Sequence, residues 1–251
     1  MSEQLLSSSA EGVCELRFNR PEKRNAITHA MYEALLRGLR EARTDSAVRV
    51  VLLSGEGAAF CAGNDLNDFL SGPAFSSEHP VMGFLHTLAT FDKPLLAAVQ
   101  GQAVGIGVTM LLHCDLVVAA RGAQLSMPFV NLGLVPEAAS SLLLPRLVGH
   151  QRAAELLFLG KPLDAAGAHT LGLVSRVVEE ATLLPEARGL ARTLAQKPQT
   201  ALLATRRLLR SDSGEIRARI DAEARLFGEQ LRSEEFREAV RAVLTRARPG
   251  S

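Results

Sequence analysis

The sequence predicts an α/β fold that is followed by a helical C-terminal region. Over the first two-thirds of the chain, short apolar runs typical of buried strands alternate with helix-forming segments, which is the pattern of α/β proteins. After about residue 137 the segments favour helix, because they are rich in Ala, Leu, Arg and Glu. A chain of 251 residues can bury one large core with a small appendage. We therefore expect a core over residues 1–197 and a helical region over residues 198–251.

The elements of the core are predicted in order from the hydrophobic pattern. Residues 13–18 alternate between apolar and charged side chains, which predicts a half-buried strand ending at the turn of residues 19–21. Thr28 is placed to cap the next helix, whose apolar side chains recur at helical spacing. Three apolar runs predict buried strands at residues 48–53, 95–99 and 115–120. A short helix is predicted near residues 107–113.

The rest of the chain is predicted as helices with one short strand. Apolar residues of the last helices, among them Ile216, Ile220 and Phe227, need a surface to cover, either the core or a neighbouring subunit. Residues 70–90 are expected to form a loop, because they contain Ser-Gly-Pro and Ser-Ser. The predicted helices are 151–159, 183–195, 199–210, 215–231 and 234–245, and the strand is 174–178.

Composition and charge exclude several classes of protein. Lys and Arg number 28 against 27 Asp and Glu, and this net charge of +1 argues against a nucleic-acid partner. The N-terminal residues lack the basic and apolar regions of a signal peptide, and polar side chains interrupt the most apolar stretch, residues 94–120. Three widely spaced cysteines and six histidines form no metal-binding pattern. We expect a cytoplasmic protein with reduced thiols, no membrane partner and no metal site.

Two glycine-containing segments, residues 55–66 and 101–109, each follow a predicted strand. A strand that leads through such a turn into a helix presents free backbone N–H groups, which can bind a phosphate or an oxygen that becomes negative during a reaction. The dinucleotide-binding pattern is absent, because Met110 stands where its third glycine is needed. One such loop alone is explained by a tight turn. Two such loops on adjacent strand–helix units favour a different role, in which a backbone N–H group from each loop binds an oxyanion.

Several motifs, in order along the chain, resemble the crotonase (enoyl-CoA hydratase/isomerase) superfamily. They are residues 19–26, 60–66, 101–107 with Cys114-Asp115, 132–136, 152–156 and 172–174. The resemblance implies a crotonase-like spiral of ββα turns with a C-terminal helical trimerisation region. It also implies an acyl-CoA thioester substrate, no cofactor beyond the coenzyme A of that substrate, and a homotrimer or dimer of trimers.

The resemblance places the site on two backbone segments. It assigns the oxyanion hole to the N–H groups of Asn64 and Ile106. We expect the loop of residues 70–90 to line the acyl pocket. The other substrate-binding positions that the resemblance implies are Arg24, Ala26, Ala62, Asp65, Leu66, Asn67, Gly105 and Phe129, with Asn64 among them.

The acids and bases indicate which reaction is expected. Hydratases of this family use two glutamates, and the corresponding positions here are Thr109 and Phe129, neither of which is a carboxylate. Glu137, directly after Pro136, resembles the single acid/base of peroxisomal-type Δ3,Δ2-enoyl-CoA isomerases. Apolar neighbours would raise the pKa of its carboxyl. The competing interpretation of Glu137 is that it is exposed to solvent in the first turn of a helix, where a negative charge is favourable.

Alternatives remain open. The same scaffold supports hydratase, dehydratase, decarboxylase or thioesterase chemistry, and the loss of both hydratase glutamates also fits a catalytically weak acyl-CoA-binding protein. Other candidate residues have plainer roles: Cys61 as a nucleophile has no neighbouring histidine, and His86 and His113 are expected on helix faces or in the core. Two further expectations each concern a pair of residues. Asp65 and Asp68 are expected to cap a helix or to contact the CoA ribose, and Arg246 and Arg248 are candidates for binding CoA phosphates.

Overall fold

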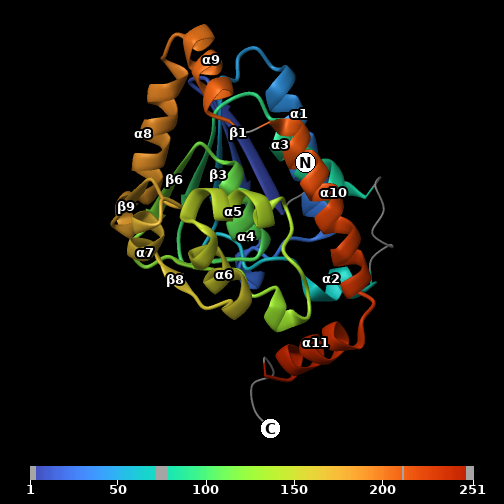
Figure 1. Ribbon diagram of the computed structural model, residues 1–251. Helices are drawn as coiled ribbons and strands as arrows, with labels where there is room; N and C mark the ends of the chain where they lie inside the picture. Colours follow the sequence, from blue (N-terminus) through green and yellow to red (C-terminus); the bar gives the residue numbers. More distant parts are fainter. Residues whose placement is uncertain (1–3, 72–78, 211, 247–251) are drawn as a thin grey trace.

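The computed structural model describes residues 4–71, 79–210 and 212–246, and its centre is a mixed sheet of six strands (Figure 1). The strand order is β1-β2-β3-β4-β6-β9, in which β1 pairs antiparallel with β2 and every later pair is parallel. The bounds are β1 Leu5–Ala10, β2 Val13–Phe18, β3 Val50–Gly55, β4 Leu95–Val99, β6 Leu116–Ala120 and β9 Arg176–Val178.

A second, smaller sheet continues from the first. Strand β4 is followed after two residues by β5 (Gln102–Val104), and β6 is followed by β7 (Gln124–Ser126), which pairs parallel with β5. Strand β8 (Leu163–Asp164) closes this sheet on the far side of β7. The chain thus passes repeatedly from one sheet to the other and then into a helix, which is a ββα repeat.

Helices cover both faces of the large sheet, and the sequence explains which residues they bury. The buried Ala187, Ala191 and Ala195 recur every four residues on α8, and their small side chains pack against one face. Helices α1, α3 and α10 lie on the other side (Figure 1). All six residues of β3 are buried, which fits the apolar run of its first four residues, Val50 to Leu53. The helices are α1 His29–Thr44, α2 Leu66–Ser71, α3 Pro80–Thr90, α4 Ile106–Thr109, α5 Ser140–Val148, α6 His150–Leu159, α7 Ala165–Thr170, α8 Leu183–Ala195, α9 Gln199–Leu209, α10 Ser213–Gln230 and α11 Glu234–Arg246, with short 3-10 helices η1 Pro21–Lys23, η2 Met110–His113, η3 Val130–Leu132 and η4 Glu180–Thr182.

Most predicted elements are confirmed, and Thr28 caps α1 by accepting a hydrogen bond from the N–H of Met31. The strand predicted at residues 13–18 is present as β2, but it is not half-buried: five of its six residues are buried, Glu15 among them, because α8 covers its second face. The loop expected over residues 70–90 is wrong for its second half, which forms α3. That helix begins with Pro80 at its N-terminus and buries apolar residues at helical spacing, including Phe84 and Leu88. Residues 72–78 of the expected loop lie outside the described residues. The sequence did not predict β1, α5 and α7, nor the three short strands of the smaller sheet, β5, β7 and β8.

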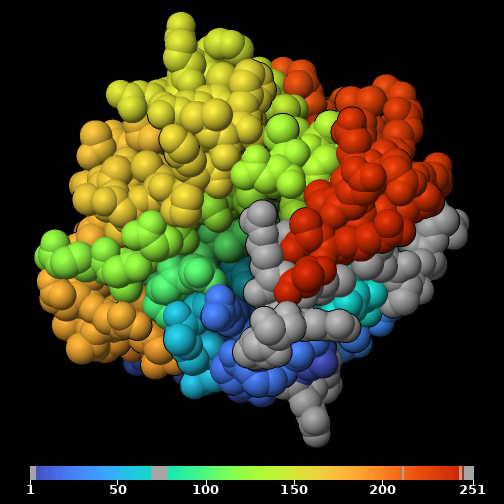
Figure 2. Space-filling model, turned by 90° about the horizontal axis from the view of Figure 1, so that it is seen from below, coloured from blue at the N-terminus to red at the C-terminus, as the bar shows by residue number. Residues whose placement is uncertain are grey.

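The C-terminal helices lie on the core. Helix α10 packs against α3 and α5, and α11 packs against η3, where the red C-terminal segment lies beside the yellow-green segment in the space-filling view (Figure 2). The boundary predicted at residue 197 falls between α8 and α9. Among the described residues, no helix combines the length and the apolarity needed to cross a membrane.

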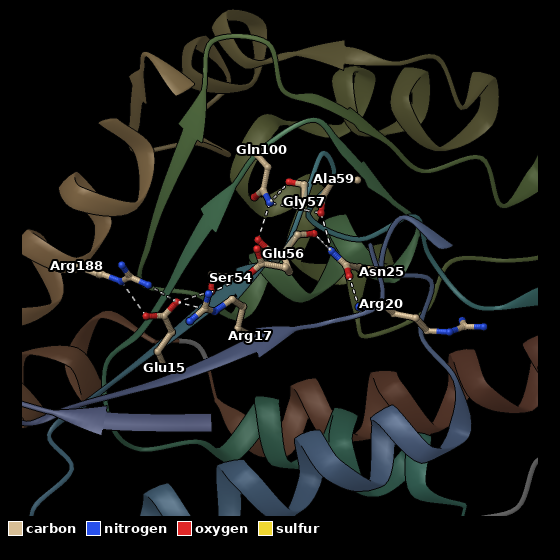
Figure 3. Close-up of polar contacts among 11 residues, drawn as sticks. Glu15, Arg17, Arg20, Asn25, Ser54, Glu56, Gly57, Ala59, Gln100 and Arg188 are labelled. Carbon is tan, nitrogen blue, oxygen red and sulfur yellow. Dashed lines mark hydrogen bonds and ion pairs between the residues drawn. The ribbon is translucent and has the colours of Figure 1, made fainter. Parts of the chain in front are cut away.

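A buried carboxylate ties α8 to the sheet (Figure 3). Glu15 on β2 accepts hydrogen bonds from Ser54 Oγ at 2.7 Å and from Arg188 Nε on α8 at 2.9 Å. Burial acts to raise the pKa of Glu15, but the hydrogen bonds from Arg188 and Ser54 and the charges of Arg188 and Arg17 outweigh it and hold this pKa below its ordinary value.

We expect Glu15→Gln to lower the free energy of unfolding by about 2 kcal/mol at neutral pH, because it removes charged hydrogen bonds from a buried site. A carboxyl whose folded-state pKa is depressed stabilises the fold above its unfolded value of 4.5 and loses this contribution as the pH falls through its folded-state pKa. Denaturant titrations at neutral pH and at about pH 3 should therefore show the difference between variant and wild type shrinking in acid. Glu56→Gln is the control, because its partner Arg17 and Glu56 itself are partly exposed. A difference that does not shrink in acid would contradict the assignment.

Candidate active site

The first glycine-containing loop runs from β3 to Asn64 and is held by the backbone on both sides. The N–H of Ile27 donates to Gly63 O at 2.8 Å, and the N–H of Asp65 donates to Ile27 O at 2.9 Å. This parallel bridge leaves the N–H of Asn64, between them, pointing away from Ile27. On the other side, the N–H of Val104 donates to Cys61 O at 2.9 Å.

The second loop places Ile106 at the first position of α4. The N–H of Gly105 donates to Ser126 O, while Gly105 O accepts from the N–H groups of Val108 and Thr109. The first N–H groups of a helix have no partner within it. Among the described residues, neither the N–H of Ile106 nor that of Asn64 has a hydrogen-bond acceptor.

The two loops touch each other. A Cβ added to Gly63 would lie 3.2 Å from Val104 O, and one added to Gly107 would lie 2.6 Å from Cys61 O. Glycine at these positions therefore lets the two backbones approach closely. The structure thus brings together the two predicted oxyanion donors on neighbouring segments.

Two buried side-chain amides, those of Asn25 and Gln100, support the first loop (Figure 3). Asn25 Nδ2 donates to Ala59 O at 2.7 Å and to Glu56 O at 2.9 Å. Gln100 Nε2 donates to Gly55 O at 2.7 Å. These bonds fix the turn that leads from β3 into Cys61, so the direction of the following N–H groups is set by buried side chains rather than by solvent.

Glu137 lies in the turn between Pro136 and α5, and its side chain is buried, with 7% of the residue exposed. Oε1 accepts a hydrogen bond from Thr109 Oγ1 at 2.5 Å. Burial raises the pKa of Glu137 to about 8, the Thr109 bond opposes this rise, and the charge of Glu223 adds to it. The interpretation as an exposed residue in a helix is therefore wrong: the helix begins at Ser140, and Glu137 faces inward.

A small cavity joins Glu137 to Asn64. Its remaining walls are apolar, from Val81 and Leu85 of α3 and from Ile220, Ala224 and Phe227 of α10, with Ala138 beside Glu137. The Tyr32 hydroxyl, which is buried, donates to Asn64 Oδ1 at 2.6 Å and orients that side chain. Glu137 and Asn64 are thus the two polar residues that line an otherwise apolar cavity, and substrate sites likewise place a few polar groups among apolar walls.

The sequence predicts residues 70–90 as a loop that lines the acyl pocket, and Val81 and Leu85 of this segment do line the cavity. They belong to a helix rather than a loop, which their spacing of four residues indicates. The periodic apolar residues of the tail carried the other signal, because Ile220 and Phe227 cover the core of their own chain. The tail therefore completes the pocket.

The remaining predicted substrate-binding residues lie around the same loops. The N–H of Ala62 donates to Arg24 O, and Ala26 O accepts from Arg20 Nη1. Asp65 Oδ1 accepts from the N–H groups of Asn67 and Asp68, which confirms Asp65 as a helix cap. Three further positions are near the loops: Leu66 begins α2, Gly105 precedes α4, and the buried ring of Phe129 packs against Gly105.

The other candidates have structural surroundings. Cys61 is fully buried, and burial raises the pKa of its thiol to about 12, so it is neutral at physiological pH. His86 on α3 pairs with Asp221 of α10 at 2.8 Å, and His113 is buried beneath the Glu137 turn. Arg248 lies outside the described residues, and the side chain of Arg246 is likewise not described. Within the described ranges, no group of three or more His, Cys, Asp or Glu side chains is arranged to hold a metal ion.

Comparison with known proteins decides the family. The model of the enoyl-CoA hydratase/isomerase family matches residues 8–249. The chain belongs to this family. Two solved structures confirm the crotonase-type fold of the enoyl-CoA hydratase/isomerase family. Pseudomonas aeruginosa OdaA has a TM-score of 0.94 and 45% sequence identity, and the match covers 97% of this chain and 99% of that one. An enoyl-CoA hydratase/isomerase from Pseudoalteromonas atlantica T6c has a TM-score of 0.92 and 40% sequence identity, and the match covers 99% of both chains.

Relatives within the enoyl-CoA hydratase/isomerase family carry out different reactions. The chain is 38% identical to the 1,2-epoxyphenylacetyl-CoA isomerase of Escherichia coli K12, over 99% of this chain and 98% of that protein. It is 36% identical to enoyl-CoA delta isomerase 2 of Rattus norvegicus over 98% of this chain, which spans 64% of that protein's length. A probable enoyl-CoA hydratase of Bacillus subtilis is 35% identical over 90% of both. The protein is thus an acyl-CoA enzyme of this family.

Proposed function

We propose that the enzyme is a Δ3,Δ2-enoyl-CoA isomerase in which Glu137 is the single acid/base. The observation that carries the proposal is the buried carboxylate of Glu137 at the isomerase position. The two hydratase positions hold Thr109 and Phe129, neither of which has a carboxylate. A hydroxyl and a phenyl ring at neutral pH do not activate water as a pair of carboxylates does.

The reaction is a proton transfer within the substrate. The Glu137 carboxylate takes a proton from C2 of a 3-enoyl-CoA, and the electron pair of that C–H bond moves into the thioester carbonyl to give a dienolate. The protonated Glu137 then returns the proton to C4, the double bond moves to C2–C3, and the carboxylate is regenerated. Nothing is oxidised or reduced, so the proposed reaction needs no cofactor other than the substrate's own coenzyme A.

Two features of the site support this chemistry. A base is most effective when its pKa lies near the operating pH, and burial raises that of Glu137 to about 8. The unpartnered N–H groups of Asn64 and Ile106 are the proposed oxyanion hole for the dienolate, and each well-aimed donor contributes about 3 kcal/mol to transition-state stabilisation. The residues around Arg24 and Ala62 would then bind the coenzyme A part.

The proposal includes the assembly and the compartment. We infer a homotrimer or dimer of trimers in the cytoplasm. Leu208 and Leu209 on α9, which are 88% and 82% exposed in the single chain, support an interface with another copy. The unpaired cysteines, of which Cys14 and Cys61 are buried, fit a reducing compartment.

A second candidate is the isomerisation of a ring-bearing epoxide. It is favoured by the match to the E. coli 1,2-epoxyphenylacetyl-CoA isomerase, which covers 98% of that protein, whereas the match to the rat enoyl-CoA isomerase covers 64%. Both candidates are isomerisations of a CoA thioester, so the reaction class is common to them and the acyl group distinguishes them.

The test is a comparison of initial rates on 3-hexenoyl-CoA, crotonyl-CoA and 1,2-epoxyphenylacetyl-CoA. We expect 3-hexenoyl-CoA to be converted to its 2-enoyl isomer at least about 100-fold faster than crotonyl-CoA is hydrated, because a second carboxylate for water is missing. Hydration at a matching rate would contradict the proposal. Turnover of the epoxide alone would select the second candidate, and tight acyl-CoA binding without any turnover would indicate a binding protein.

A further inference from the structure

The turn that carries Glu137 has an unusual backbone. Ala138 and Ala139, directly after Glu137, have φ angles of 59° and 58°, in the left-handed region that residues with a Cβ rarely adopt. Two consecutive alanines in this region are unfavourable unless the surroundings fix them. The Glu137 turn therefore needs partners that hold it.

One peptide unit of this turn is held at both ends. The carbonyl of Ala138 accepts a hydrogen bond from His113 Nε2 at 2.8 Å, and the N–H of Ala139 donates to Glu223 Oε2 at 2.6 Å. Both groups belong to the bond between Ala138 and Ala139. His113 comes from η2, and Glu223 comes from α10, more than eighty residues further along the chain.

Glu223 also holds the start of α5. Its Oε1 accepts from the N–H of Ser141 at 2.9 Å and from Ser141 Oγ, which in turn accepts from Arg219. These N–H groups are those that a helix leaves unpaired at its N-terminus, and the residue before α5, Ala139, has no side chain to cap them. A carboxylate from another helix takes that role, and only 5% of Glu223 is exposed.

We propose that His113 and Glu223 are positioning residues, which clamp the Ala138–Ala139 peptide unit and thereby fix the Glu137 carboxylate between Thr109 and the pocket. This inference rests on the proposed function only in naming Glu137 as the base. Neither residue needs to touch the substrate. Each acts through the backbone of the turn.

The charges around Glu137 give the clamp a second effect. Thr109 from α4 donates to it, while Tyr32 from α1 and Cys61 and Asn64 from the loop after β3 are neutral, as is His113, whose pKa burial lowers to about 4. Glu223 of α10 also faces Glu137. Burial raises the pKa of the Glu223 carboxyl, and the hydrogen bonds from Ser141 and Ala139 and the charge of Arg219 oppose this rise. When Glu223 is ionised, its negative charge opposes the ionisation of Glu137.

The test compares Glu223→Gln with Glu223→Asp. The Gln variant keeps the length but loses the charge, and its amide cannot accept from all the donors. We expect kcat on 3-hexenoyl-CoA to fall about tenfold or more with KM changed far less, and the acid limb of the kcat/KM profile to move to lower pH. The Asp variant keeps the charge but loses the reach, so its kcat should fall without that movement. Glu215→Gln is the matched control, because Glu215 joins the same α10 to α5 through an exposed pair with Arg146.

A purely structural role would lower the melting temperature and leave the pH profile in place. An unchanged kcat and an unchanged acid limb in Glu223→Gln would overturn the inference. If that variant does not fold, His113 supplies the test: His113→Leu should lower kcat, and His113→Gln, whose amide N–H can still donate to the Ala138 carbonyl, should recover part of it. Equal kcat in wild type and His113→Leu would overturn the clamp.

A direct titration separates this inference from the proposed function. The Glu137 carboxyl can be followed by ¹³C NMR, with Glu137→Gln to assign its signal, and its midpoint should move to lower pH in Glu223→Gln whatever thioester the enzyme uses. If the wild type does not isomerise 3-hexenoyl-CoA but the midpoint moves, the proposed function fails and the clamp stands. If isomerisation occurs and the midpoint does not move, the clamp fails alone.

Discussion

Replacing Glu137 with Gln is expected to lower kcat for 3-hexenoyl-CoA isomerisation by about a thousandfold. Gln has nearly the same shape and can still accept the hydrogen bond from Thr109 Oγ1, but it cannot take a proton from C2. Stopped-flow or steady-state absorbance of the conjugated product measures the loss. Titration calorimetry with a saturated acyl-CoA should show nearly unchanged binding, since the N–H groups of Asn64 and Ile106 remain.

The wild-type pH profile is the companion measurement. A base acts only when it is deprotonated, and burial raises the pKa of Glu137 to about 8. The value of kcat/KM should therefore rise about tenfold per pH unit below this pKa and become level above it. The residual kcat/KM of Glu137→Gln should not show this rise with pH. Full turnover in the variant, or a flat wild-type profile between about pH 6 and about pH 8, would remove Glu137 from the mechanism.

The second large effect is expected from Gly107→Ala, which should lower kcat/KM about a hundredfold. The new Cβ would lie 2.6 Å from Cys61 O and 3.0 Å from Cys61 Cβ, so α4 must move away from the loop that leads to Asn64. That movement separates the N–H of Ile106 from the N–H of Asn64. Steady-state kinetics with 3-hexenoyl-CoA measures the loss.

Gly189→Ala is the matched control, because Gly189 is also helical and no described atom lies within 4 Å of its added Cβ. It should raise the free energy of unfolding by about 0.5–1 kcal/mol and leave the kinetics unchanged. Comparable activity in the two variants, with both folded by circular dichroism, would show that the close approach of the loops does not matter for catalysis.

The elements that could be predicted from the sequence are those whose pattern is local. The strand Val13–Phe18 and the helix Leu183–Ala195 have the predicted bounds, because alternation and a stripe of small residues are visible within a few residues. Strand β1 was missed because three of its six residues are serine, and its pairing with β2 is what makes it a strand. Local propensity could not supply that partner.

The site was predictable to a similar extent. The Asn64 and Ile106 loops carry their glycines in the sequence, and Glu137 follows a recognisable Pro136. Glu223, by contrast, is one of several carboxylates on a charged helix, and its role depends on where α10 docks. The burial of Glu137 depends on the same docking, because Ile220 and Phe227 form the wall beside it. Contacts over such a distance in the chain leave no periodic signal.

The docking of α10 has a consequence for the order in which the enzyme becomes competent during its synthesis. The sheet and both loops are complete in the nascent polypeptide once Ala195, the last residue of α8, has left the ribosome. At that stage Glu137, the proposed acid/base, has neither the apolar cover of Ile220 and Phe227 nor the neighbouring carboxylate of Glu223, so the burial that raises its pKa is not yet in place. We therefore expect the proposed isomerisation to require the docking of α10, and a chain that ends before this helix to be inactive toward 3-enoyl-CoA.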